Sequence, residues 1–286
     1  MLVTNPKIPI IKEIGFLVDN PMSINIGPKT SYDNKFMYSC DISDISNMTG
    51  AKFFNRDMLK IILPKRNSLY EKIINNSILF DFVNNKKSKN FIILQEYMVK
   101  FETEFELFSN MNNKPILYLE FGVWEGKSIA VASKNKDPNS LFYGFDTFTG
   151  LPEDFTKGMI KGYFSTNGVV PKIDDNRIKF VKGLFSVTLD EVLPEIISNL
   201  KDRQLFINMD ADLFSSTLFV LTKLNSIITE GVYIRFDEFG ELSENSEFLA
   251  FRDYVRAFGK DFEIIMADKW YRHITIKIKP NPDVCI

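Results

Sequence analysis

One stretch near the middle of the chain joins a buried strand, a tight loop and the start of a helix. The apolar run 117–119 ends in Glu120, and Gly122 and Gly126 then open an amphipathic segment. The next apolar run along the chain ends in Asp146. Glycines at such a turn let a ligand approach the backbone, and an acid at the neighbouring strand end can bind ribose hydroxyls. The pattern therefore predicts a site for a nucleotide-shaped ligand.

The composition excludes several classes of protein. With 286 residues, 45% hydrophobic and 25% charged, the chain allows one large domain or a core with an extension. Its formal net charge of −2 provides no basic field for nucleic acid. The N-terminus lacks the features of a signal peptide, and no run reaches the roughly 20 apolar residues of a membrane span. The widely separated Cys40 and Cys285 favour a cytoplasmic protein without disulfides.

The spacing of apolar residues along the chain changes at Pro115. Before it, helical spacing of apolar residues predicts helices over 68–83 and 91–111. After it, short apolar runs alternate with helical segments, which is typical of a parallel sheet covered on both faces. We therefore expect an N-terminal extension over residues 1–112 and a domain over 113–286. The partly helical extension could act as a lid or as the dimer face of a homo-oligomer.

The second part predicts a doubly wound α/β sheet. The expected strands are 116–123, 141–146, 178–181, 205–209, 232–236, 262–266 and 271–278, and the expected helices are 128–134, 188–199, 216–228 and 246–258. The last two strands read as an antiparallel hairpin. A mostly parallel seven-stranded sheet with such a hairpin suits the Rossmann-like fold of class I methyltransferases better than a dinucleotide dehydrogenase.

Glu120 separates the glycine loop from the dinucleotide fingerprint Gly-x-Gly-x-x-Gly, because it occupies the first glycine position. An acid there would repel a pyrophosphate, and it can face the cationic end of S-adenosylmethionine (SAM), directly or through water. Asp146 at the next strand end also favours SAM, although a turn-capping aspartate would leave the same pattern. Trp124 lies inside the loop, where it could pack on a ligand or simply fill the loop.

Two further predicted strands end in acids. One is followed by Asp210 and Asp212, and the other by Asp237 and Glu238. If the strands are neighbours, their ends lie about 4.8 Å apart, and Asp210, Asp237 and Glu238 converge at the carboxyl edge of the sheet. Close carboxylates repel unless a cation or shared protons offset them, and hard oxygen ligands suit Mg²⁺. Alternatively, these acids cap helices or are solvated.

Several ordered segments between about residues 115 and 245 resemble the macrocin O-methyltransferase family, whose members are metal-dependent SAM enzymes that methylate sugar hydroxyls of natural products. The matching segments are 120–128, 145–152, 182–189, 210–217 and 237–240. The resemblance implies cofactor contacts from the glycine loop, including Ser128, and from Gly183.

The resemblance also implies a divalent metal on Asp210, Asp237 and Glu238, with Asp212 as the general base. The family usually has paired aspartates followed by Tyr, where this chain has Glu238 and then Phe239. Glutamate can still bind a metal, but its longer side chain changes the geometry of the site.

Together these features predict Mg²⁺-dependent transfer of a methyl group from SAM to a hydroxyl of a sugar or glycosylated small molecule. Asp210 would help to activate the hydroxyl through the metal, and Asp212 would take its proton. The alternatives are methylation of a catechol-like molecule, a non-catalytic methyltransferase-like subunit and an NAD-linked oxidoreductase. We expect His273 to lie away from the strand ends, and residues 148–168 to form a lid.

Overall fold

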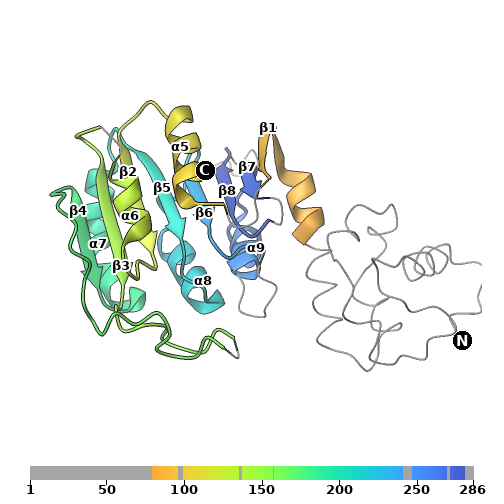
Figure 1. Cartoon of the computed structure of the whole chain (residues 1–286). Coiled ribbons are helices and arrows are strands. Elements are labelled where there is room, and N and C mark those ends of the chain that lie inside the picture. Colours follow the sequence, from red (N-terminus) through yellow and green to blue (C-terminus); the bar gives the residue numbers. More distant parts are fainter. Residues whose placement is uncertain are drawn as a thin grey trace, which may run out of the picture. The chain divides into compact units, whose positions relative to one another are not determined.

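The computed structural model describes residues 79–95, 99–134, 137–156, 158–240, 247–268 and 271–280. The chain divides into two compact units, residues 1–85 and 86–286, and the strands and helices named below belong to the second (Figure 1). Most of the helix predicted over 68–83, and both cysteines, lie outside the described residues. No helix in the described ranges is long and apolar enough to cross a membrane.

The described strands form one eight-stranded sheet in the order β1-β7-β8-β6-β5-β2-β3-β4. They are β1 Lys87–Leu94, β2 Ile116–Phe121, β3 Leu141–Asp146, β4 Ile178–Lys182, β5 Gln204–Met209, β6 Tyr233–Phe236, β7 Phe262–Asp268 and β8 Ile274–Ile278. Neighbours run parallel, except that β8 is antiparallel to β6 and to β7. The prediction of a mostly parallel class I methyltransferase sheet with a terminal antiparallel hairpin is confirmed.

The strand β1 replaces part of a predicted helix. Spacing predicted one helix over 91–111, but β1 pairs in parallel with β7 and only Phe101–Met111 forms a helix, α5. Ile92 packs on the core whereas Ile93 is 42% exposed, as alternation along a strand requires. A short apolar run fits either structure by period alone, so pairing with β7 decides. The sheet therefore has one more strand than predicted and begins before residue 113.

Helices lie on both faces of the sheet (Figure 1). The first pair, α5 and α6 (Lys127–Ala132), are in mutual contact. On the other face α8 (Phe214–Lys223) contacts both α7 (Phe185–Asn199) and α9 (Glu247–Phe258). Right-handed crossovers from β2 to β3 and from β4 to β5 run in opposite directions along the sheet, which places their helices on opposite faces.

The central strands carry the core and align the site. All six residues of β2 are buried, and Tyr118 stacks on Phe206 of β5 with ring centroids 5.7 Å apart. Register pairs Phe121 with Met209, and Met209 with Phe236. Since these are the last residues of three parallel neighbours, the segments that follow β2, β5 and β6 leave the sheet side by side.

Candidate active site

The loop after β2 is shaped by a close approach to the end of β5. Gly122 has a φ of +93°, and a Cβ added there would lie 1.7 Å from the carbonyl oxygen of Asp210. No other residue fits that gap, and glycine adopts this φ without strain. Trp124 and Gly126 also have positive φ, 49° and 76°, so the chain turns tightly before α6. The predicted glycine loop therefore lies directly against the first acid after β5.

Asp146, at the end of β3, organises this loop through its carboxylate. Oδ2 accepts hydrogen bonds from the backbone N–H groups of Val123 and Trp124, both at 2.8 Å. Oδ1 accepts one from the N–H of Phe148 at 2.7 Å. A carboxylate can accept about four hydrogen bonds, so it retains capacity for a ligand hydroxyl. Asp146 lies beside the glycine loop, where an acid that binds ribose has to lie.

Glu120 is fully buried beneath the loop. Its carboxylate accepts hydrogen bonds from the Tyr118 hydroxyl, from Ser128 Oγ at 2.9 Å and from Asn208 Nδ2 at 3.3 Å. Burial raises the pKa of Glu120 to about 7, against the opposing effect of these three donors. Glu120 thus ties the first turn of α6 to β2 and β5, and its predicted interaction with the cationic end of SAM stays a prediction.

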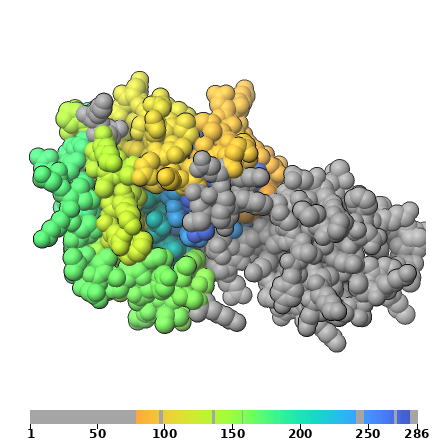
Figure 2. All heavy atoms as spheres, viewed as in Figure 1, coloured from red at the N-terminus to blue at the C-terminus, as the bar shows by residue number. Residues whose placement is uncertain are grey.

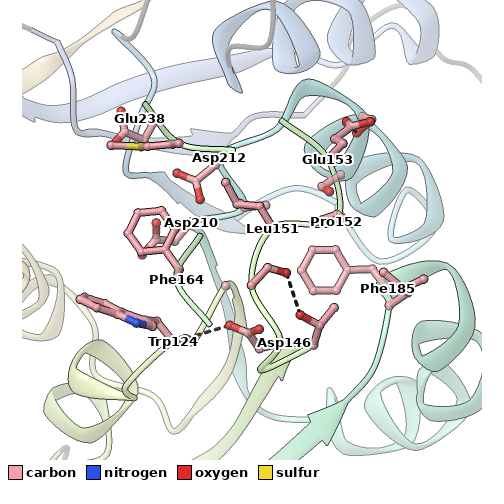
Figure 3. A pocket seen from close by; sticks show the side chains of 18 of the residues that line it. Trp124, Asp146, Leu151, Pro152, Glu153, Phe164, Phe185, Asp210, Asp212 and Glu238 are labelled. Carbon is pink, nitrogen blue, oxygen red and sulfur yellow. Dashed lines mark hydrogen bonds between the residues drawn. The ribbon is translucent and has the colours of Figure 1, made fainter. Parts of the chain in front are cut away.

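A cavity of about 670 Å³ opens at the carboxyl edge of the sheet. Figure 3 shows Asp146, Asp210, Asp212 and Glu238 around it. Apolar residues from the glycine loop, the loop after β3 and the start of α7 complete much of the wall: Trp124, Leu151, Pro152, Met159, Phe164, Leu184 and Phe185. A largely apolar cleft with a few converging polar groups is typical of a small-molecule site.

Three residues predicted to contact the cofactor lie just outside this cavity. Gly126 is the N-cap residue of α6. Ser128 lines a smaller cavity of about 200 Å³ that also includes Trp124 and Asp210. Figure 2 shows the surface hollowed there, with teal and blue atoms of later residues between the yellow of α5 and the yellow-green of α6. Gly183 lines a groove of about 660 Å³ next to the main cavity.

Asp210 and Asp237 are neighbours, because they follow paired residues of adjacent strands. The backbone N–H of Asp237 donates to the carbonyl oxygen of Met209 at 3.1 Å. Both aspartates line the main cavity. Burial, followed by the charges of Asp237 and Asp212, raises the pKa of Asp210 well above its ordinary value. Carboxyl groups are therefore concentrated beside the glycine loop, and the protonated form of Asp210 is favoured.

Asp212 faces the same cavity from a left-handed backbone conformation. Its φ is 58° and only 9% of the residue is exposed. Burial, and then the charges of Glu238 and Asp237, raise the pKa of Asp212 to about 7, although Arg272 opposes them. A carboxyl group with a pKa near neutrality is well matched to general-base catalysis.

Two arginines occupy part of the acidic cluster. Asp237 Oδ1 pairs with Arg235 Nη2 at 2.8 Å, and Glu238 pairs with Arg272. Burial by itself would raise the pKa of Asp237, but the charges of Arg235, His273 and Arg272 and the hydrogen bond from Arg235 together outweigh it, and the pKa is lowered. Among the described residues, no three His, Cys, Asp or Glu side chains stand ready as a metal site. Asp210, Asp237 and Glu238 all line the cavity at the carboxyl edge of the sheet, and their role as metal ligands stays a prediction.

The chemistry of the cluster nevertheless fits a hard cation. Asp210 has no ion-pair partner within the described ranges, and burial, followed by the charges of Asp237 and Asp212, raises its pKa and disfavours its charged form. A doubly charged ion between Asp210 and Asp237 would favour the charged form and have the oxygen ligands it prefers. Glu238 could bind the ion as a further ligand only if its ion pair with Arg272 were broken.

Glu247, which sequence reasoning missed, joins the two acidic loops. It lies fully buried at the start of α9. Its Oε1 accepts the backbone N–H of Ala211 at 3.2 Å, and its Oε2 accepts that of Glu238 at 3.0 Å. Burial raises its pKa well above the ordinary value. No local pattern marks this residue, because both partners come from other segments.

His273 lies closer to the site than expected. Its Nε2 is 3.6 Å from Asp237 Oδ1, whereas the sequence placed it away from the strand ends. The reason is the antiparallel direction of β8, whose first residues lie beside the last residue of β6. Burial, and then the charge of Arg235, lower the pKa of His273.

The loop after β3 forms one wall of the cavity. Its ends are closed by backbone hydrogen bonds from Gly162 N–H to Leu151 O at 2.9 Å and from Gly168 N–H to Phe148 O at 2.7 Å. Phe164 packs against Trp124 with ring centroids 5.4 Å apart. The segment predicted as a lid thus reaches the glycine loop, and its movement stays a prediction.

A family model described as macrocin O-methyltransferase (TylF) matches residues 109–272, more than half of the chain. Among solved structures, the O-methyltransferase NovP is 20% identical, with 63% of this chain and 78% of that chain covered and a TM-score of 0.46. The calicheamicin methyltransferase CalS11 is 17% identical, with 87% and 98% covered and a TM-score of 0.47. An O-methyltransferase from Bacillus cereus is 13% identical, with 80% and 99% covered and a TM-score of 0.40. No curated protein matches the chain.

Proposed function

Because the chain belongs to the macrocin O-methyltransferase family, we propose that this SAM-dependent O-methyltransferase acts on a sugar hydroxyl with the help of a divalent cation, Mg²⁺ or a similar ion. The observation that carries the proposal is the contact between Gly122 and Asp210. It brings the loop expected to hold the methyl donor against the acids expected to hold the acceptor.

The cofactor would lie along the glycine loop. Asp146 would accept hydrogen bonds from the ribose hydroxyls, since it already lines the cavity beside that loop. Leu184 and Phe185 would cover the adenine ring with apolar surface. Trp124, which is 41% exposed, would lose solvent contact when the cofactor binds. Glu120 would act from below, by holding Ser128 and thus the start of α6.

The cation would be held by Asp210 and Asp237, with Glu238 as a third ligand after release of Arg272. When bound, such an ion makes an alcohol easier to ionise and orients it. The protein side chains do the remaining work. By holding the ion, Asp210 and Asp237 would place the acceptor hydroxyl near the glycine loop, and Asp212 would accept its proton.

Methyl transfer itself is an in-line displacement. The acceptor oxygen forms a bond to the methyl carbon while the carbon–sulfur bond breaks, and the sulfur leaves as a neutral thioether. The sulfonium is reactive without further activation, so the protein contributes mainly orientation and proton removal. The apolar wall of Leu151, Pro152 and Phe164 would keep water away from the reacting groups.

The proposal is tested by incubating the protein with isotopically labelled SAM, Mg²⁺ and a panel of deoxysugar and heptose conjugates. We expect label on one acceptor by mass spectrometry, loss of transfer after chelation and recovery with added Mg²⁺. Transfer that survives complete chelation would remove the cation from the mechanism. Binding of NAD in preference to SAM in equilibrium titrations would overturn the cofactor assignment.

A further inference from the structure

Arg235 is a charged residue in the middle of an otherwise apolar strand, β6, and only 2% of it is exposed. Each nitrogen of its guanidinium has its own partner. Nε donates to Glu104 Oε2 at 2.7 Å, Nη1 to Asn208 Oδ1 at 3.0 Å and Nη2 to Asp237 Oδ1 at 2.8 Å. Its Cζ lies over the Phe101 ring, 5.1 Å from the ring centroid.

The guanidinium of Arg235 determines the orientation of the Asn208 side-chain amide. Because Asn208 Oδ1 accepts from Arg235, its Nδ2 faces the other way and donates to Glu120 Oε2 at 3.3 Å. The second oxygen of Glu120 accepts from Ser128 Oγ at 2.9 Å. One chain of hydrogen bonds therefore runs from Asp237, at the acceptor side, to the first turn of α6, at the cofactor side.

We infer that Arg235 is a positioning residue that holds both halves of the reaction site in register: it orients Asp237 directly, and it orients Glu120 and Ser128 through Asn208. The inference rests on the proposed function, both for the role of Asp237 and for the place of the cofactor along the glycine loop. Lysine cannot replace it, because an ammonium is a point charge without the planar fork that three partners in different directions require.

The protein contains a matched control for this substitution. Arg177, which directly precedes the edge strand β4, likewise combines a carboxylate partner and a ring, and it donates to backbone carbonyls as well. It pairs with Asp175 at 2.7 Å, donates to the Asp137 carbonyl at 2.9 Å and lies 5.2 Å from the Phe142 ring. An Arg177→Lys variant therefore reports what the same chemical change costs in stability away from the site.

The experiment measures calorimetric dissociation constants for S-adenosylhomocysteine and for Mg²⁺, with thermal unfolding alongside. Arg235→Lys should weaken both ligands about tenfold, the effect of roughly one lost charge-assisted hydrogen bond each. Asn208→Ala leaves the pairing of Arg235 with Asp237 in place, so it should weaken S-adenosylhomocysteine alone. Arg177→Lys should change neither constant beyond about twofold, although its melting temperature falls.

Equal binding by Arg235→Lys and the wild-type chain, with only a lower melting temperature, would overturn the inference. If Arg235→Lys does not fold, Asn208→Ala decides: unchanged binding of S-adenosylhomocysteine would refute the link to Glu120. A wild-type chain that binds S-adenosylhomocysteine but no Mg²⁺ would refute the proposed cation, and the cofactor arm would still test Arg235.

Discussion

At the residue scale, the proposed role of Asp212 requires a side chain that can accept a proton. Asparagine keeps its shape and tolerates a φ of 58°, but it cannot accept a proton. Asp212→Asn should therefore lower turnover by about 10²–10⁴-fold, with binding of S-adenosylhomocysteine and thermal stability preserved. Asp202→Asn is the control, because Asp202 has a φ of 62° and is exposed. Turnover of Asp212→Asn near that of the control would remove Asp212 from the mechanism.

The raised pKa of Glu120 predicts how the stability of the chain depends on pH. Its pKa rises from 4.5 to about 7 in the folded chain, mainly through burial. The protonated form is thus favoured by folding, and this stabilisation is complete below pH 4.5 and lost as the pH rises through 7. A Glu120→Gln variant does not titrate here. Between about pH 5 and 8, the free energy of unfolding of the wild-type chain should therefore fall by up to ~3 kcal/mol relative to that of the variant.

Denaturant titrations of both chains across this range provide the measurement for Glu120. The other buried carboxyl groups titrate in both chains, so their contributions cancel in the difference. Free energies that run parallel with pH would show that Glu120 is ionised throughout.

At the element scale, the ends of β2 and β5 approach so closely that a single added methyl group should strongly lower the free energy of unfolding. Gly122→Ala adds a Cβ 1.7 Å from a backbone oxygen, whereas Gly162→Ala, at a φ of +87°, meets nothing within 4 Å. The second variant should lose only the roughly 1–2 kcal/mol of a left-handed alanine. The first should lose several times more and bind no S-adenosylhomocysteine. Equal losses in denaturation experiments would show that the strand ends move apart easily.

At the scale of the whole molecule, the unit that binds the cofactor should begin at Lys86. A chain starting there keeps β1 and α5, including Phe105, Phe108 and Glu104, all of them buried. It should unfold cooperatively and bind S-adenosylhomocysteine like the full chain. A chain starting at residue 113 loses this core contribution and the Glu104 partner of Arg235, so it should not fold. Circular dichroism melts and calorimetry distinguish the outcomes.

The sequence by itself determined the fold class and the edge of the sheet that carries the site. Apolar runs that end in Glu120, Asp146, Asp210 and Asp237 suffice for this, because parallel strands bring their carboxyl ends to one edge. Such patterns are local, and each strand can be read from its own residues.

Only the tertiary structure decided what these acids contact. Arg235 is separated by 131 positions from Glu104, and Glu247 bonds to two loops that precede it. The antiparallel direction of β8 brings His273 to Asp237, and pairing with β7 makes β1 a strand. Contacts between distant segments depend on how elements pack, and the period of apolar residues within one element carries no information about its neighbours.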